Sequence, residues 1–315
     1  MNIKILGAGL ALAASTAFAQ YPNKPVTIVV GFEPGGGTDT TARILAPVLA
    51  EALGQQVIVE NRSGAGGNIA VDHVAKSTPD GYTIVLANVG ALCVNPHYLK
   101  TGYDPLKDLV PISMAAIFAN VLVVQPSLGV KSVNDYVKLG RSKLVTYASS
   151  GIGSAGHMAG QLLKDMAKLN LEHVPYKGGG PAMQGFLGGQ VDSFFATPIS
   201  SISQIRAGKA IAIATTGTQR AKLMPDVPTI AESGYQGYEA LNWYGYLAPA
   251  KTPKDVVDRL HREIAKALAN PKVIDQLAKT GVEPAAMTPE EFGRYIKTEF
   301  DTWGKVVKQA GIKAQ

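Results

Sequence analysis

The stretch from Gly31 to Asp39 constrains the fold most, because it joins two different kinds of element within a few residues. The apolar run 26–30 before it predicts a buried β-strand. Residues 40–45 after it predict the start of a helix, with Thr38 or Asp39 as the N-cap. A strand, a short loop and a helix in this order are the opening of an α/β unit, in which strands lie parallel.

Three successive glycines, Gly35 to Gly37, make this loop chemically distinctive. Glycine adopts positive φ without strain, and its small size lets backbone N–H groups approach a ligand closely. A helix N-terminus behind the glycines adds unpaired N–H donors and a partial positive charge, which suit an anion. Two interpretations stay open on this stretch alone: a plain turn between strand and helix, or an anion-binding loop.

The start of the chain predicts an export signal. A positive charge at Lys4 precedes an apolar run of small residues, 5–18, and Ala17-Phe18-Ala19 matches an A-x-A cleavage site. The apolar run is too short to cross a membrane, and no later run is long enough and free of charge. We therefore expect residues 1–19 to be a signal peptide and the mature chain to begin at Gln20 in the periplasm.

Charge and cysteine content narrow the possible functions. The formal net charge is +6, but the Lys and Arg residues are scattered along the chain. A nucleic-acid-binding face needs clustered basic residues, so no nucleic-acid partner is expected; the charge fits weak steering of small anions. Cys93 is the only cysteine. It cannot form an internal disulfide, and we expect a small buried residue.

The α/β rhythm recurs along the chain and predicts two lobes. A second glycine loop, 61–68, leads into a helix at 69–76, whereas Pro47 is expected to kink or break the first helix. Further strands are expected at 56–60, 83–87, 121–124, 144–148, 190–196 and 210–214. We assign 20–120 together with 243–315 to a discontinuous first lobe, and 121–242 to a second lobe.

The C-terminal part predicts a return to the first lobe. Residues 241–249 form an aromatic strand, and amphipathic helices follow from Pro253, through 272–279, to 289–309. A return of this kind gives two crossovers between the lobes and a cleft between them. Ligands of α/β sheets bind outside the carboxyl ends of the strands, where the glycine loops gather.

A third glycine-rich loop, at 151–156, matches a known fingerprint. Gly151 to Gly156 has the G-x-G-x-x-G pattern of dinucleotide-binding proteins, with a strand before it, a helix after it and Glu172 further on. An exported protein rarely meets such cofactors, and the pattern lies in mid-chain. We therefore predict no cofactor. The preferred interpretation is a second anion-binding loop, with the hydroxyl groups of Ser149 and Ser154 facing the cleft.

Hydrolase and metal signatures are absent from the sequence. No serine stands in G-x-S-x-G, and the histidines show no H-E-x-x-H spacing, so neither a nucleophile nor a metal site is predicted. Asp39 is either a capping residue paired with Arg43 or a ligand contact. His157 at a helix start is equally open between a structural role and ligand contact. Asp192 either fixes a loop or orients a donor group.

Taken together, the motifs resemble those of the Bug-type extracytoplasmic solute-binding proteins, the binding components of tripartite tricarboxylate transporters. In the first lobe the resemblance rests on Phe32-x-Pro34-Gly35-Gly36-x-Thr38-Asp39, Val59-Glu60-Asn61-Arg62-x-Gly64-Ala65-Gly66-Gly67 and Pro79-Asp80-Gly81-Tyr82. In the second it rests on Gly151-x-Gly153-Ser154-x-x-His157, Val174-Pro175-Tyr176-Lys177-Gly178, Gly189-x-Val191-Asp192 and Pro225-Asp226-Val227-Pro228-Thr229. The match runs in order over nearly the whole mature chain.

The resemblance implies a two-lobed periplasmic-binding-protein fold of type II that closes on a small carboxylate. It implies that the two glycine loops hold the carboxylate from both sides. Carried onto this sequence, it nominates Phe32, Gly36, Thr38, Asp39, Ser149, Ser154 and His157, with further lining from Tyr176, Asp192, Thr197 and Tyr244. Residues 89–96 depart from the family's polar pattern before Asn95-Pro96, which suggests a more apolar far end of the pocket.

The expected function is capture of a small organic carboxylate, a di- or tricarboxylate or an aromatic acid, and its delivery to the permease subunits of a tripartite tricarboxylate transporter. We expect a monomer and no catalysis. Two alternatives remain open at this stage. One is an exported oxidoreductase or acid–base catalyst that uses Asp39, His157 and Asp192. The other is a ligand sensor or co-receptor.

Overall fold

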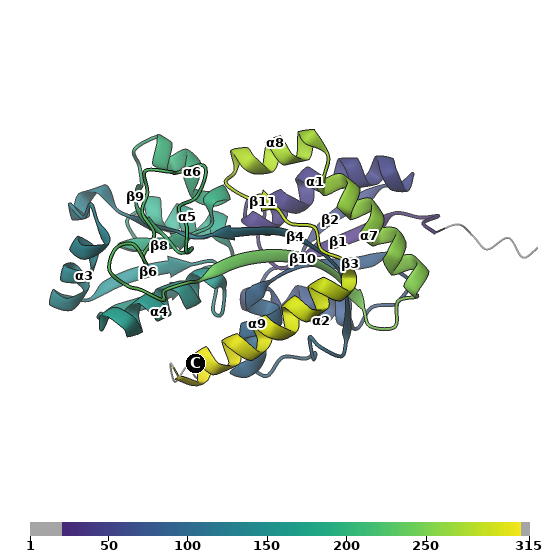
Figure 1. Ribbon diagram of the computed structural model, residues 1–315, viewed down its shortest axis with the longest axis horizontal. Coiled ribbons are helices and arrows are strands. Elements are labelled where there is room, and N and C mark those ends of the chain that lie inside the picture. Colours follow the sequence, from purple (N-terminus) through teal and green to yellow (C-terminus); the bar gives the residue numbers. More distant parts are fainter. Residues whose placement is uncertain (1–20, 310–315) are drawn as a thin grey trace, which may run out of the picture.

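The computed structural model describes residues 21–309; the predicted signal peptide lies outside these residues. Two β-sheets form the centres of two α/β lobes, and the long strands β4 and β10 run from one lobe towards the other (Figure 1). Within the described part of the chain, no helix is long and apolar enough to cross a membrane.

The first sheet contains six strands in the order β11-β4-β10-β3-β1-β2. Its parallel part consists of β1 (Val26–Val30), β2 (Val57–Asn61) and β3 (Thr83–Asn88). The long strands β4 (Leu109–Ala119) and β10 (Leu241–Pro249) and the short β11 (Glu283–Pro284) add antiparallel pairings. Tyr244 lies opposite Asn88, so the start of β10 meets the carboxyl end of β3.

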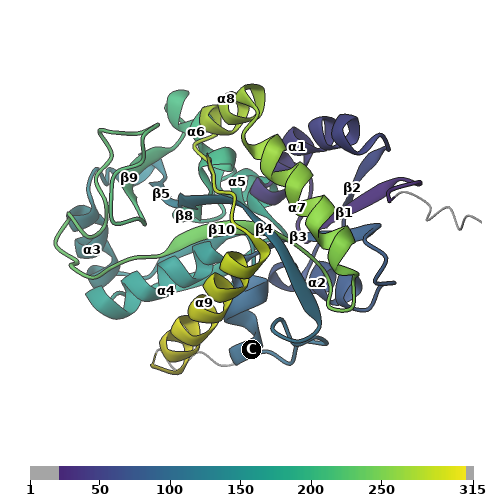
Figure 2. The same cartoon turned by 45° about the vertical axis from the view of Figure 1, so that its right-hand side comes forward.

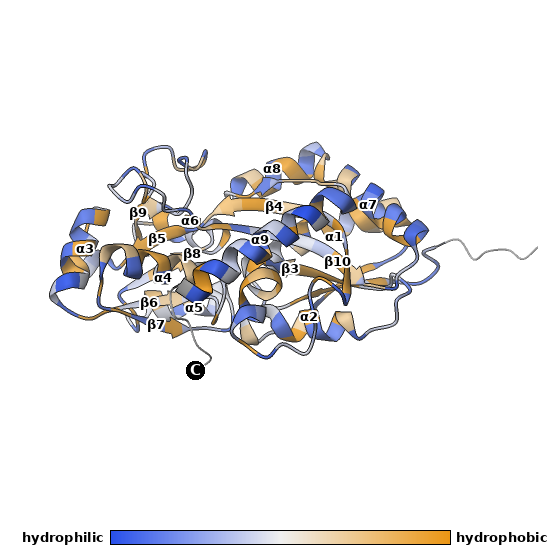
Figure 3. Cartoon of the chain, turned by 60° about the horizontal axis from the view of Figure 1, so that its bottom comes forward, coloured by the Kyte–Doolittle hydropathy of each residue, from blue (hydrophilic) through white to orange (hydrophobic). Residues whose placement is uncertain are grey.

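Helices cover both faces of this sheet (Figure 2). The helices α1 (Gly37–Leu53), α7 (Lys254–Leu268) and α8 (Pro271–Lys279) share a core with one face. The helices α2 (Asn68–Ala75) and α9 (Pro289–Gln309) pack on the other. Each C-terminal helix buries one apolar stripe, with Val256, Leu260 and Ile264 as the stripe of α7. Figure 3 shows the polar turns of these helices facing outwards.

The second sheet contains five strands in the order β7-β6-β8-β5-β9. These strands are β5 (Val121–Val124), β6 (Val145–Ser149), β7 (Leu171–Pro175), β8 (Ser193–Ala196) and β9 (Ile211–Thr215). Four helices alternate with them: α3 (Val133–Ser142), α4 (Ala155–Ala167), α5 (Gly179–Leu187) and α6 (Pro198–Arg206). Ser132 caps α3 by accepting a hydrogen bond from the Asp135 N–H, as its position before the helix predicts.

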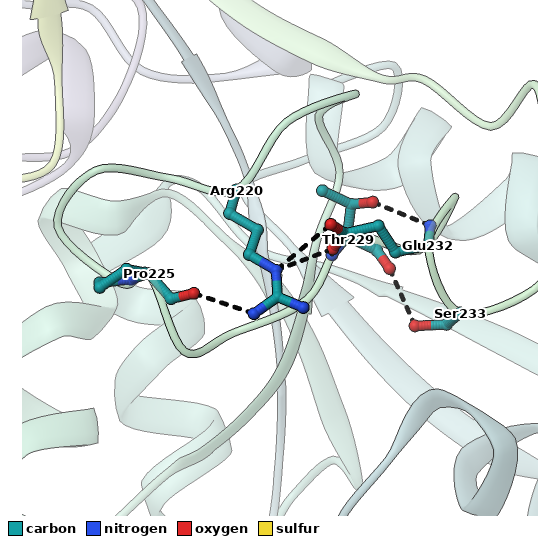
Figure 4. A network of polar contacts seen from close by, with 5 residues as sticks. All are labelled: Arg220, Pro225, Thr229, Glu232 and Ser233. Carbon is teal, nitrogen blue, oxygen red and sulfur yellow. Dashed lines mark hydrogen bonds and ion pairs between the residues drawn. The ribbon is translucent and has the colours of Figure 1, made fainter.

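The chain crosses between the sheets twice. Asn120 alone separates β4 from β5, and residues 216–240 connect β9 back to β10. An ion pair between Arg220 and Glu232 braces this long connection, and Glu232 also accepts the N–H of Thr229 at 2.8 Å (Figure 4). Thr229 in turn bridges to Thr215 at the end of β9. The second crossover is therefore an ordered loop, with its own capping box, anchored beside the first crossover.

The structure differs from two expectations about the first helix, a break at Pro47 and the position of the N-cap. Pro47 does not break the first helix, because α1 continues from Gly37 to Leu53 with Pro47 on its exposed side, where water can hydrate the carbonyl group that the proline leaves free. The N-cap of α1 is Gly36 rather than Thr38 or Asp39. The helix therefore begins inside the glycine run, which brings its first N–H groups to the loop.

Candidate functional site

An inner pocket lies where the carboxyl ends of strands from both sheets meet. Its cavity volume is about 20 Å³. Its lining residues are Phe32, Gly36, Gly37, Thr38, Asn88, Ser150, Ala155, Gly179, Thr197, Asn242 and Tyr244. An outer pocket with a cavity volume of about 180 Å³ shares Phe32 and Ser150 with it and adds Gly64 to Gly66, Gly151, Ile152, Pro175, Tyr176 and Lys177. Loops from both lobes thus line both pockets.

Four helices begin at the wall of the inner pocket. Gly37 opens α1, Ala155 opens α4, Gly179 opens α5, and Thr197 is the N-cap of α6. The first N–H groups of a helix have no partner within it, and its N-terminus carries a partial positive charge. In α1, α5 and α6 no side chain caps these groups. The pocket therefore gathers uncapped helix N-termini from three directions, whereas α4 is capped by Ser154.

The lining of the inner pocket contains no charged side chain. An anion held there would be neutralised by backbone dipoles and hydroxyl groups. Two side-chain oxygens in the wall, Thr38 Oγ1 and Asn242 Oδ1, are buried and have no hydrogen-bond partner among the described residues. Buried polar atoms are normally paired, so both are available for a ligand.

Asp39 shapes the first loop, defined here as residues 31–37, from outside the pocket. One carboxylate oxygen accepts the Gly35 N–H at 2.9 Å. The other accepts bonds from Arg43 at 2.9 Å and from Asn61 at 3.0 Å. The predicted pairing with Arg43 is thus present, and it orients a carboxylate that also holds the glycine turn. The charge of Asp39 is satisfied by these partners and does not line either pocket.

Ser149, His157 and His173 support the second loop, defined as residues 149–154. Ser149 Oγ donates to the Gly151 carbonyl at 2.9 Å and lies 2.7 Å from His173 Nε2. His157 Nδ1 accepts the Gly153 N–H at 3.0 Å, and the two imidazole rings stack with centroids 3.9 Å apart. The acceptor role of Nδ1 requires a neutral His157 that carries its only ring proton on Nε2. Protonation of this ring would therefore break its bond to the second loop.

Burial lowers the pKa of His157 to about 4 and also lowers that of His173; the nearby Lys164 acts on His157 in the same direction. Unfolded histidine has a pKa near 6.5, so between about pH 6.5 and pH 4 only the unfolded chain takes up these protons. The free energy of unfolding should then fall on acidification by up to about 1.4 kcal/mol per pH unit for each histidine. Above pH 7 both rings are neutral in both states and this loss disappears.

Denaturant unfolding between pH 7.5 and 5.0 tests this. His173→Gln removes one of the two titrating rings. The contribution of the histidine pair to the pH dependence of the free energy of unfolding should then fall by half. Lys164 and Glu172, the charged residues beside the rings, stay unchanged in that variant. An identical pH slope in the wild-type protein and the variant would contradict the assignment.

Each of the two loops contacts a segment of the opposite lobe across the cleft. The Glu33 N–H donates to the Lys177 carbonyl at 3.1 Å, and the Cα of Gly66 packs beside Gly151 and Ile152. A Cβ on Gly153 would lie 1.5 Å from Asn95 Oδ1. The G-x-G-x-x-G spacing therefore has a structural cause here: its first two glycines allow the lobes to approach closely, and Gly156 packs against the Phe195 carbonyl.

The structure divides the predicted site residues into three groups. Phe32, Gly36, Thr38, Thr197 and Tyr244 line the inner pocket, and Tyr176 lines the outer one. Asp39, Ser149, Ser154 and His157 stabilise the two loops without lining either pocket; Ser154 caps α4 by accepting the His157 N–H at 3.3 Å. Asp192 alone forms the third group, because it neither lines a pocket nor supports one of the two loops.

Asp192 sits at the opposite edge of the second sheet. β8 begins at Ser193, which pairs with Tyr147 of the parallel strand β6, so Asp192 precedes the amino end of its strand. There its carboxylate accepts the Thr146 N–H at 2.8 Å and the Thr146 hydroxyl at 2.9 Å. Ligands of such sheets bind at carboxyl ends. The expectation that Asp192 could meet the ligand is therefore corrected: its role is structural.

The apolar segment 89–94 does not line the inner pocket either. All five of its side chains are buried in the core, and Cys93 Sγ lies 3.7 Å from the Ile296 carbonyl of α9. The hint of an apolar far end is thus removed. Instead, sequence reasoning missed Asn88, Ser150, Gly179 and Asn242 in the pocket wall. Asn88 ends a predicted strand, which is the position that could have revealed it.

Two lobes joined by two crossovers, with loops of both lobes around one pocket, define a periplasmic-type solute-binding protein. The model of the tripartite tricarboxylate transporter family receptor matches residues 41–312. The chain belongs to this family.

Solved structures agree with this assignment. The periplasmic binding protein BugD is 36% identical, with a TM-score of 0.89 over 94% of this chain and 100% of that one. Rpa4515 of R. palustris with adipate is 36% identical, with a TM-score of 0.89 over 93% and 99% of the two chains. MatC from Rhodopseudomonas palustris with bound malate is 30% identical, with a TM-score of 0.85 over 91% and 100%. The Bug-type resemblance and the two-lobed fold predicted from the sequence are thus confirmed.

Proposed function

We propose that this protein is an exported periplasmic receptor that binds a small organic carboxylate and delivers it to the permease subunits of a tripartite tricarboxylate transporter. The observation that carries the proposal is the convergence of four helix N-termini on a pocket lined by neutral residues. Such termini favour an anion. Two related receptors were solved with the carboxylates adipate and malate, which supports the same ligand class.

The proposal includes an assignment of the chain to two lobes that close on the ligand. We assign 20–120 and 243–315 to one lobe and 121–242 to the other, with hinges at Asn120 and near Asn242. Loop contacts such as Glu33 to Lys177 connect the two lobes across the cleft. A ligand that touches both lobes binds the closed state more tightly, so it shifts the population towards closure. We propose that the monomer carries the whole site and presents the closed form to the permease.

The site residues in this proposal act as donors or as supports. Backbone N–H groups of Gly37, Thr38 and Gly179 and the hydroxyl groups of Thr38 and Thr197 bind a carboxylate group. Asp39, Ser149, Ser154 and His157 hold the loops that present these donors. The catalytic alternative loses support, because Asp39 and His157 are engaged in loop contacts and Asp192 lies at the far sheet edge.

A panel of carboxylates tests the proposal. Succinate, adipate, malate and benzoate should each be titrated calorimetrically, with putrescine and glucose as ligands of the wrong charge. The proposal expects at least one carboxylate to bind, without turnover. Binding of the neutral or cationic ligands alone would contradict it, and conversion of a bound carboxylate into a product would favour an enzyme.

Thr38→Ala should weaken carboxylate binding at little cost to stability. The hydroxyl group is buried and has no partner among the described residues, so its only expected partner is the ligand. Loss of one hydrogen bond to a charged group corresponds to about 1.5–3 kcal/mol, or roughly 10- to 150-fold in affinity. Calorimetry measures the change.

Thr41→Ala is the matched control for this change. It removes another buried, unpartnered hydroxyl group from the same helix, but Thr41 does not line the pocket. Equal effects of the two substitutions on affinity would remove Thr38 from the site.

A further inference from the structure

Two asparagines form a buried pair at the crossovers. Asn120 lies between β4 and β5, and Asn242 lies near the start of β10, opposite Phe118 in β4. Asn242 Nδ2 donates to Asn120 Oδ1 at 3.4 Å. That bond leaves Asn242 Oδ1 and Asn120 Nδ2, both buried, without a partner among the described residues. Because a primary amide can accept and donate at once, this pair is incompletely satisfied.

Asn242 is the member of the pair that faces the ligand. It lines the inner pocket although only 5% of the residue is exposed, and Tyr244, two residues further along β10, lines the same pocket. Alternate residues of a strand point to the same side, so both side chains face the pocket. With Asn242 Nδ2 assigned to the 3.4 Å bond to Asn120 Oδ1, the atom left for a ligand is the carbonyl oxygen, an acceptor.

The remaining polar groups of the wall are mainly donors. Helix N-termini contribute N–H groups, and Thr38 contributes a hydroxyl group. Asn88 uses its carbonyl oxygen to accept the Ala91 N–H at 3.3 Å, so this acceptor is occupied. A carboxylate offers only acceptors. It therefore satisfies the donors but leaves Asn242 Oδ1 unpaired.

We propose that Asn242 is a specificity residue whose Oδ1 accepts a hydrogen bond from a hydroxyl or amino group on the ligand, close to the bound carboxylate. The inference rests on the proposed function and deepens it. It assigns the ligand to carboxylic acids that carry such a donor, over the otherwise identical acids that lack it. A site built around a buried acceptor discriminates against the analogue that would leave it unpaired.

Asn120 acts as the positioning residue of the pair. Its N–H donates to Thr216 Oγ1 at 2.9 Å, and its carbonyl accepts the Thr216 N–H at 3.0 Å. Thr216 Oγ1 donates onward to the Ala240 carbonyl at 2.7 Å, just before β10. These contacts join the first crossover to the second. A ligand that bonds to Asn242 is thus connected to both segments through which the lobes are joined.

The experiment uses ligand pairs that differ in one hydroxyl group: malate and succinate, lactate and propionate, mandelate and phenylacetate. Calorimetry on the full mature chain gives the affinity ratio within each pair. In the wild type, the hydroxy acid of at least one pair should bind about tenfold or more tightly than its partner. In Asn242→Leu that ratio should fall to about twofold or less, while affinity for the deoxy acid changes less than about threefold.

Controls keep the result interpretable. Thr252→Val removes a buried, unpartnered hydroxyl group beyond the far end of β10 and should leave the ratio unchanged. Retained binding of the deoxy acid shows that a variant is folded; if Asn242→Leu does not fold, Asn242→Ala replaces it. Carboxylates that bind without preference for the hydroxyl group, or a ratio that survives the loss of the amide, overturn the assignment. If no acid of the panel binds the wild type, the proposed function itself fails.

Discussion

Gly66→Ala is expected to reduce carboxylate affinity by about 100-fold or more, because it should hold the cleft open. Gly66 follows β2 of the first sheet, and a Cβ there would lie 2.2 Å from the Ile152 carbonyl oxygen, which follows β6 of the second sheet. Ile152 is reached only when the lobes meet, so this clash is confined to the closed form, whereas a second contact, with Asn95 Nδ2 at 3.0 Å, lies within the first lobe and is present in both forms. Lowering the closed fraction lowers the apparent affinity in proportion. Calorimetry measures the affinity, and small-angle X-ray scattering measures closure.

Gly54→Ala is the matched control for Gly66→Ala. Both glycines have a similar positive φ, +65° at Gly66 and +68° at Gly54, so the backbone strain on an alanine is similar. A Cβ at Gly54 has no neighbour within 4 Å. The control should lose a little stability and keep its affinity. Normal ligand-induced compaction in Gly66→Ala would show that closure does not depend on this contact.

Thr197→Asp is expected to abolish carboxylate binding while the protein remains folded. Thr197 is the N-cap of α6 and lines the inner pocket, and aspartate is a favoured N-cap residue. The new carboxylate would lie where the helix dipoles converge and would satisfy them in place of the ligand. Two like charges about 4 Å apart repel by about 4 kcal/mol at an effective dielectric constant of 20, which corresponds to roughly 1000-fold in affinity.

Thr197→Asn separates charge from shape in this test. Asparagine is nearly isosteric with aspartate and also caps helices, but it is neutral. The affinity of the Thr197→Asn variant for the carboxylate should stay within about tenfold of the wild-type affinity. Thermal unfolding of both variants checks that α6 remains capped. Carboxylate binding that survives the aspartate would show that the ligand's charge lies elsewhere.

Much of the fold follows from local sequence patterns. The bounds of β1, β5, β10 and α9 agree with those expected from apolar runs and amphipathic periodicity. The longest strand, β4, was not predicted. Pro111 and the small residues Ala115 and Ala116 interrupt a β pattern, and the strand is fixed instead by pairing with β10 and β11. Tertiary pairing of this kind leaves little local signal.

The candidate site was predictable in part. Glycine loops after strands directed attention to Phe32, Gly36 and Thr38, all of which line the inner pocket. Asn242 was missed, because its role depends on the register of β10 against β4 and on its bond to Asn120. Asp192 was nominated by the family resemblance, although it already lay near the amino end of the strand predicted at 190–196; β8 in fact begins at Ser193, so Asp192 precedes the strand at the end remote from both pockets. The position of a residue in the sequence does not by itself show whether it lies at the amino or the carboxyl end of a strand.

A crystal structure of the complex with the tightest-binding carboxylate of the panel tests the central claim most directly. The account predicts one carboxylate group in the inner pocket, within hydrogen-bond distance of the N–H groups of Gly37, Thr38 and Gly179 at the starts of α1 and α5. A ligand whose carboxylate instead pairs with Lys177 in the outer pocket, away from all of these helix N-termini, would contradict it.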